Sequence, residues 1–439
     1  MLEIVNTKKY HHSFILYCSQ PINRTVLVTH VCVVFYALSF WIQMGTLPII
    51  TNKLDIDPIT FGNLQTAFGV AQLLGGPLFG RFGDLYGNRT AFILSFISAF
   101  FSYSILGFAD SLLHVFLSRL SSVFMHTMQG AQMIITDLSL PVKRSESLGK
   151  TSISYGVGMV VGPLIGGFCT KHQGEKFATF LAAGGCILGI GLIKSFIPRD
   201  TKMLMYSEIK ENHPQLHDIE DISYSQKLTK TKTSKLINFD IFLSLIWRNR
   251  IAKNLLFIKL VSGIPIGILH SMFSILLLNH FEVSPQVNGL VLSYIGVLSM
   301  LTQGIIVGKL ACMGFHDHTL IKFSVLVLSI TYFIMSVFVS GIIGFCALMA
   351  PMVLGGSVFN SLVQGNLTKC VSHEHTGSVL GFSMAVNSFM RSISPTLGGY
   401  MFKIYGFSSF GLLGALCNGM LFIYLTFYMK KECFLFSSK

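Results

Sequence analysis

Residues 80–89 read Gly-Arg-Phe-Gly-Asp-Leu-Tyr-Gly-Asn-Arg, a short run of glycine and charge between two long apolar segments. In a soluble protein this composition would indicate an ordinary surface loop. This chain of 439 residues, however, is 51% hydrophobic and only 12% charged, about half the charged fraction of soluble domains. The run is therefore predicted to be the hinge loop between two transmembrane helices.

Apolar segments of about 20 residues recur along the whole chain, and each can cross about 30 Å of hydrocarbon. They predict an all-α membrane protein with twelve transmembrane helices. The alternating segments typical of membrane β-barrels are absent from the sequence. The expected spans are residues 25–47, 60–80, 90–109, 112–136, 148–170, 177–197, 254–278, 286–310, 321–340, 343–366, 377–402 and 408–429.

One long polar segment divides these spans into two six-helix bundles, residues 25–197 and 254–429. The segment, residues 198–253, is rich in charged residues, serine and threonine, which indicates a flexible cytosolic linker that could recruit protein partners. The remaining parts are a cytosolic N-terminus (1–24) and a cytosolic tail (430–439).

Positive charge is distributed unevenly over the loops. The N-terminus, the loops on its side of the membrane and the C-terminus hold 24 of the 32 lysine and arginine residues, and the opposite loops hold four. Because such residues collect on the cytosolic side, both termini and the 80–89 loop are predicted to be cytosolic. This cytosolic bias also explains the net charge of +13, so no nucleic acid partner is predicted. The first span is expected to act as an uncleaved signal anchor in the plasma membrane or an intracellular membrane.

Sequence motifs for enzymatic chemistry are absent. The nine cysteines are scattered without metal or disulfide spacing, and no glycine-rich loop with lysine would bind ATP. The sequence therefore predicts no enzyme, catalytic residue, metal or cofactor. The lipid bilayer is its first expected partner.

The two bundles resemble each other weakly. The pattern at residues 162–167 recurs 232 residues later at 394–399, and Gly80 recurs 228 residues later as Gly308. Self-similarity between two six-span halves is typical of secondary transporters, which bind substrate near the midplane between the halves.

The opening run gains meaning from this context, because it resembles the conserved loop of the major facilitator superfamily. Leu85 and Asn88 stand where that family has basic residues. The resemblance implies a conformational latch, in which the acidic residue contacts the start of span eleven. The alternative is a solvated loop charge. The residues that match the loop are Gly80, Asp84, Gly87 and Arg89.

Span five resembles the antiporter motif of the drug–proton exchangers in the same family. The resemblance implies a transporter that works by alternating access and exports a small-molecule substrate, an organic cation or drug-like solute. Export would be coupled to protons by antiport, with the proton gradient as the energy source. The alternative is generic helix packing, because small residues at four-residue spacing let helices approach closely. The residues of this motif are Gly158, Gly162, Pro163, Gly166 and Gly167.

Two basic residues lie inside the second half of the spans. Arg391 is about 13 residues into span eleven, or roughly 20 Å deep, where a charged residue is a functional hypothesis by default. Its alternative role is to bind backbone carbonyls. Lys259 is about a turn and a half from the end of span seven, so snorkelling to the interface competes with a role in substrate binding or coupling.

Span four carries a polar stripe, because spacings of seven, three and three residues place its members near one face of a helix: Arg119, His126, Gln129 and Gln132. The resemblance places this span beside the transport pathway. His126 could relay a proton or be a hydrogen-bonded core residue, Arg119 could be coupling or structural, and Asp137 is expected to be an interfacial acid. Further pathway candidates are His30, Trp41, Gln43, His270, Asn360 and Gln364.

No acidic residue lies in the middle of a span, whereas the deep charges, Arg119 and Arg391, are positive. Two alternatives to cation efflux therefore stay open. One is a transporter of an organic anion or lipid-like solute that these arginines select. The other is a non-transporting membrane scaffold.

Overall fold

The computed structural model describes most of the predicted spans. The predicted linker 198–253 and the tail 430–439 lie largely outside the described residues. The described residues are 3–5, 14–17, 20–139, 144–199, 201, 250–313, 316–339, 341–370 and 376–427.

A small antiparallel sheet precedes the first long helix. Strand β1 (Glu3–Val5) pairs with β2 (Phe14–Tyr17), which pairs with β3 (Gln20–Asn23). In the register Ile15 lies opposite both Ile4 and Ile22.

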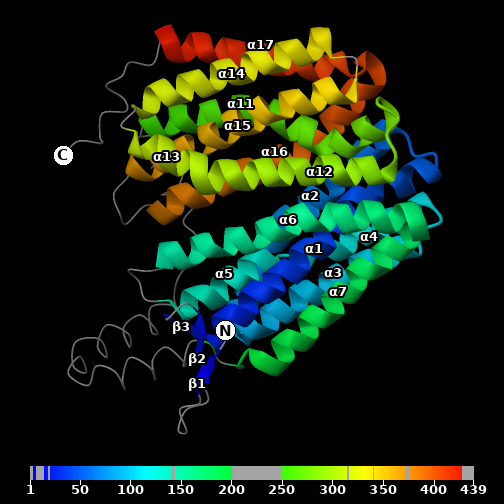
Figure 1. Cartoon of the computed structure of the whole chain (residues 1–439), viewed down its shortest axis with the longest axis vertical. Helices are drawn as coiled ribbons and strands as arrows, with labels where there is room; N and C mark the ends of the chain where they lie inside the picture. The colour runs from blue at the N-terminus through cyan, green and yellow to red at the C-terminus, as the bar shows by residue number, and fades with distance from the viewer. Residues whose placement is uncertain are drawn as a thin grey trace.

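The remaining described elements are helices in two groups, which Figure 1 shows one above the other. The first group is α1 (Arg24–Lys53), α2 (Pro58–Tyr86), α3 (Asn88–Gly107), α4 (Leu112–Ser121), the 3₁₀ turn η1 (Ser122–Phe124), α5 (Thr127–Asp137), α6 (Arg144–Gln173) and α7 (Glu175–Phe196). The second is α11 (Arg250–Asn279), α12 (Pro285–Leu301), the π-helical η4 (Thr302–Ile306), α13 (Val307–Cys312), α14 (Asp317–Phe338), α15 (Ile342–Lys369), α16 (Thr376–Tyr405) and α17 (Ser408–Phe427).

Eight of the described helices are long and apolar enough to cross a membrane. Spans four and eight are each built from two helices joined by η1 or η4. The predicted fold class, an all-α membrane protein with two pseudo-symmetric six-helix bundles, is confirmed for this helical part of the chain.

Both α2 and α12 start with the same local signal. Pro58 and Pro285 are their first residues, where a missing backbone N–H costs nothing. The residue before each proline caps the helix: the Asp57 carboxylate accepts from the backbone N–H of Thr60, and the Ser284 hydroxyl accepts from that of Val287. The two helices therefore begin at equivalent places in the two bundles.

The predicted loop at residues 80–89 is mostly helical, so that prediction is wrong in detail. Helix α2 continues to Tyr86, and α3 begins at Asn88. The reversal is made by Gly87 alone, with φ of +89°, a conformation that side chains other than glycine rarely adopt. The motif therefore lies on the last turns of α2 and the first turn of α3.

The prediction of a continuous helix over 112–136 is also wrong. Helix α4 ends at Ser121, and Met125 and His126 are not helical. The break leaves carbonyl groups without helical partners, and Gln72 of α2 donates from Nε2 to the carbonyl of Met125 at 2.9 Å. A neighbouring polar side chain thus satisfies the broken backbone, as a membrane interior requires.

Candidate functional site

The two bundles meet along two seams, α2 with α16 and α6 with α12. Each seam joins two antiparallel Pro-x-x-x-Gly elements, Pro58–Gly62 with Pro395–Gly399 and Pro163–Gly167 with Pro285–Gly289. A Cβ on Gly62 would clash with the Pro395 carbonyl oxygen, and a Cβ on Gly399 with that of Pro58. The same holds for Gly289 against Pro163 and Gly167 against Pro285. The absence of side chains is what lets these backbones touch.

Polar contacts flank the seams. Lys403 Nζ lies 2.8 Å from Asp57 Oδ2, and Lys171 Nζ donates to Gln286 Oε1 at 2.6 Å. The hydrogen bond from Lys403, followed by the cap from Thr60, lowers the pKa of the Asp57 carboxyl to about 2. The bonds made by Lys403 and Lys171 each join one bundle to the other, so this end of the molecule is sealed.

The opposite end, where α1 begins and α17 ends, is open. Among the described residues the hydrogen bonds between bundles all lie in the half of the helices near the seams. In Figure 1 the helices of the two bundles converge toward the right and separate toward the left. At the open end Asp84 is exposed and makes no hydrogen bond or ion pair within the described part of the chain. The predicted latch contact is therefore not formed here.

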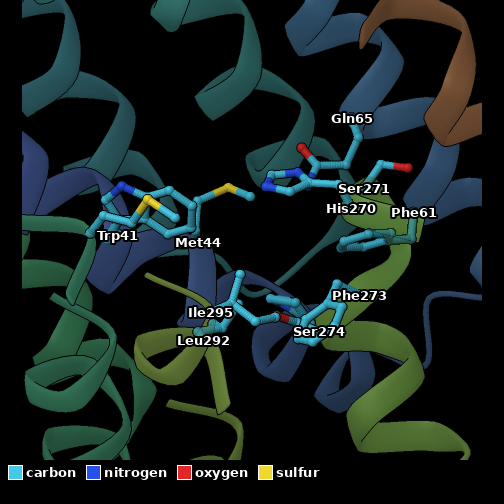
Figure 2. Close-up of a pocket in the computed structure, with 12 residues that line it drawn as sticks. Trp41, Met44, Phe61, Gln65, His270, Ser271, Phe273, Ser274, Leu292 and Ile295 are labelled. Carbon is cyan, nitrogen blue, oxygen red and sulfur yellow. The ribbon is translucent and has the colours of Figure 1, made fainter. Parts of the chain in front are cut away.

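A small cavity lies between the bundles just inside the sealed end (Figure 2). Its volume is about 50 Å³. Trp41 of α1 and His270 of α11 face each other across it, with ring centroids 6.4 Å apart and nearly perpendicular. The other lining residues are Met44, Pro48, Phe61, Gln65, Met159, Ser271, Phe273, Ser274, Leu292 and Ile295. The lining is mostly apolar and aromatic, as in small-molecule sites.

Arg391 of α16 lies in the same inter-bundle space. Its backbone touches α2, because a Cβ on Gly69 would lie 3.1 Å from the Arg391 carbonyl oxygen. Its side chain is exposed and makes no hydrogen bond or ion pair within the described residues. Its charge is close enough to act on rings from both bundles, those of Tyr36, His126, Tyr155 and His270.

Arg119, by contrast, is buried inside the N-terminal bundle, with 1% of its surface exposed. Its guanidinium lies 5.6 Å from the ring centroid of Phe68, and Nε donates to Ser118 Oγ at 3.3 Å. It does not reach the space between the bundles, and the break at His126 removes the continuous stripe predicted for span four. Gln129 instead packs near Gly80.

Lys259 of α11 is not at the interface, so the snorkelling prediction is wrong. Only 3% of its surface is exposed. Its Nζ donates to Ser383 Oγ of α16 at 2.6 Å and to Gln364 Oε1 of α15 at 3.1 Å. Of the predicted pathway residues, the structure thus joins Lys259 with Gln364, apart from the cavity.

The antiporter-type motif in α6 has two faces. Gly158, Gly162 and Gly166 lie against the backbone of α1 around residues 37–42. Gly167 and Pro163 lie against α12 across the seam. One face therefore packs the N-terminal bundle, and the other closes the contact between bundles.

Of the predicted latch residues, Arg89 is held by a hydrogen bond inside the N-terminal bundle. Arg89 donates from Nη2 to the Lys194 carbonyl of α7 at 2.6 Å. Asn88, where the family has a basic residue, donates from Nδ2 to Asp137 Oδ2 at 2.6 Å. Asp137, which is predicted to be an interfacial acid, is thus a hydrogen-bond partner at the α3–α5 contact.

Other predicted pathway residues lie elsewhere. Gln43 is buried in α1, and Asn360 is exposed on α15 but does not line the cavity. Two polar residues were missed, Gln65 and Ser383. A signal existed for both, because each is a polar residue in an apolar span.

Comparisons with known proteins agree with this geometry. The Major Facilitator Superfamily profile matches residues 29–340. Solute carrier family 22 member 18 of Mus musculus is 33% identical over 412 residues, covering 92% of this chain and 96% of that protein. Tetracycline resistance protein, class H, of Pasteurella multocida is 21% identical, covering 93% of this chain and 97% of that protein.

A solved structure shares the fold. The crystal structure of a POT family transporter in complex with a thioalcohol-conjugated peptide aligns with a TM-score of 0.75 at 14% identity, covering 94% of this chain and 98% of that one. The family profile covers more than half of the chain. The protein is a multi-pass membrane transporter and not an enzyme, and it belongs to the major facilitator superfamily.

Proposed function

We propose that this transporter moves an organic anion, or a solute with an anionic group, by alternating access. The observation that carries the proposal is the free guanidinium of Arg391 between the bundles. A guanidinium offers five N–H donors and pairs with carboxylate or phosphate in a bidentate manner. No Asp or Glu lines the adjacent cavity, so nothing there would neutralise a cationic substrate.

The aromatic rings provide the second part of substrate recognition. Trp41, Phe61 and His270 line the cavity, and flat solutes pack well on such rings. Asn360, Gln43 and Arg391 do not line the cavity itself, so we infer that the substrate extends from the rings near the seams toward Arg391.

The uneven distribution of lysine and arginine over the loops supports a cytosolic location for the open end, where α1 begins. The structure then corresponds to a state open to the cytosol and sealed on the other side. In the opposite state Asp84 would meet the start of α16, where the positive end of a helix favours an anion.

A second candidate is proton-coupled efflux of organic cations or drug-like solutes. The similarity to a tetracycline resistance protein and the motif in α6 favour it. The rings around the cavity could bind a flat cation without a carboxylate.

Vesicles reconstituted with the purified protein separate the two candidates. Uptake of an anionic dye and of a cationic dye is measured with and without an imposed pH gradient. We expect the anionic dye to be carried, and Arg391→Gln to lower that flux at least about 100-fold, because the charge that would pair with the substrate between the bundles is lost. Lys309→Gln removes an exposed charge from the same bundle and should change little. Transport of the cationic dye alone would contradict the proposal and favour the second candidate.

A further inference from the structure

The buried ammonium of Lys259 has no role in the substrate cavity. It lies between α11, α15 and α16, and both of its hydrogen-bond partners, Gln364 and Ser383, are neutral. An unpaired charge in a membrane interior is costly. A lysine kept in such a place is therefore expected to do something that an apolar residue could not.

No charged group of the described residues compensates Lys259. Helix α17 brings Tyr424 against Phe257 and Asn418 against Ser262, and neither touches the ammonium. The nearest charges on the other packed helices are committed or distant. Lys369 of α15 pairs with Asp317, and Arg391 is eight residues, or about 12 Å, farther along α16 than Ser383.

The partners of Lys259 suit both of its protonation states. With the ammonium, Ser383 Oγ accepts from Nζ and donates its own proton to Gln364 Oε1 at 2.7 Å. With the neutral amine, the Ser383 hydroxyl can turn and donate to the nitrogen, because a hydroxyl is both donor and acceptor. The site can therefore lose a proton without leaving a polar group unsatisfied.

Arg119, which is also deeply buried, cannot change its protonation state in this way. Arg119 stays protonated in proteins, so it can supply a fixed charge but cannot release a proton. Lysine changes protonation readily when it is buried. The N-terminal bundle has a comparable pair between α1 and α6, where His30 Nδ1 lies 2.9 Å from Ser154 Oγ. That histidine is only partly buried and lies near Lys150.

We propose that Lys259 carries the coupling proton of this transporter, with Ser383 and Gln364 holding it in the state seen here. When α11 separates from α15 and α16, one N–H bond of the ammonium breaks, the proton passes to water and the nitrogen keeps the electron pair. On return the amine takes a proton from water. This inference rests on the proposed transport function and identifies its coupling residue.

The test uses two assays on the full-length protein in vesicles. Counterflow of the anionic dye without any gradient reports transport, and accumulation driven by a pH gradient reports coupling. We expect Lys259→Met to keep counterflow within about threefold of the wild type and to lose gradient-driven accumulation at least about tenfold. Lys259→Arg keeps the charge but cannot release it, so it should lose accumulation as well. Lys309→Gln, which removes an exposed lysine from the same bundle, is the control and should keep both activities.

A milder variant protects the test against misfolding. Ser383→Ala removes one acceptor of the ammonium, so the pH midpoint of accumulation should move toward acid by up to about one unit. An unchanged midpoint in Ser383→Ala, or wild-type accumulation in Lys259→Met, would overturn the inference. If the wild-type protein showed counterflow but no gradient-driven accumulation, the inference would be overturned too, while the transport function would stand. Absence of wild-type counterflow would instead overturn the proposed function.

Discussion

The two bundles use the same residues where they touch each other and different residues where each holds its own helices together. Both seams join Pro-x-x-x-Gly elements, with α2 and α12 as equivalent helices on one side and α16 and α6 on the other. Inside the bundles the equivalent contacts differ. Closure is thus a shared backbone property, whereas charge and proton chemistry are free to differ between the halves.

The difference is clearest at the open end. In the N-terminal bundle the amide of Asn88 donates to the carboxylate of Asp137, and in the C-terminal bundle the amide of Asn366 donates to the carboxylate of Asp317. Asn88 and Asp317 are both the first residue of their helix, and each pair is separated by 49 residues. The same hydrogen bond is therefore built with its donor and acceptor exchanged.

The largest effect is expected from breaking the shared seams. Gly62→Val and Gly289→Val should each lower transport at least about 100-fold, because a side chain forced between two touching backbones costs about 3 kcal/mol or more. The two losses should be similar, since the seams are equivalent. Transport into vesicles measures them.

Gly184→Val in α7 is the matched control, because a Cβ there meets nothing within 4 Å. It should transport like the wild type. If Gly62→Val were inactive and Gly289→Val fully active, closure would depend on one seam, and the equivalence of the two would be wrong.

A smaller effect is expected from exchanging the open-end pair. Asn88→Asp places two carboxylates at hydrogen-bond distance and should destabilise the N-terminal bundle by about 1–3 kcal/mol. Adding Asp137→Asn recreates the arrangement of Asp317 and Asn366, so it should restore at least half of the loss. Thermal unfolding in detergent measures both variants. A double variant as unstable as the single one would show that the N-terminal bundle does not accept the arrangement of the C-terminal bundle.

Much of the fold follows from the sequence, because span length, loop charge and the glycine–proline repeat are each one-dimensional signals. Two of the four Pro-x-x-x-Gly elements, those in α6 and α16, could be found from the recurrence of residues 162–167 at 394–399. Their partners could not, because which element meets which depends on how the two bundles rotate against each other.

The site was less predictable for two physical reasons. The break before His126 depends on Gln72 of another helix, so no local pattern in span four announces it. The burial of Lys259 depends on α15 and α16 covering it, whereas its distance from the helix end favoured snorkelling. The role of Arg391 stays a prediction, which rests on its depth in the span, because an arginine there is exceptional.

The smallest effect concerns the ion pair of Asp57 and Lys403, which only the α2–α16 seam has among the described contacts. In the sealed state this pair and the Thr60 cap lower the pKa of Asp57 to about 2, from an ordinary value of 3.8. If opening the seam removes Lys403, the carboxyl returns toward its ordinary pKa. The contribution of the pair is therefore full above about pH 4 and is lost as the pH falls from there toward 2.

The Lys403 side chain is 51% exposed and that of Asp57 is 36% exposed. Ion pairs that solvent reaches contribute about 0–1 kcal/mol, so the sealed population should change at most about fivefold. Nitroxide labels at Gln173 and Tyr405, one in each bundle at the sealed end, would report the distance by electron spin resonance in a variant without native cysteines. We expect Asp57→Asn to shift the population slightly toward the open form at pH 7 and to remove its change between pH 4 and 2. If that change persisted in Asp57→Asn, another group would control the seam, and the α6–α12 seam, with Lys171 bound to a neutral glutamine, would be the one to examine.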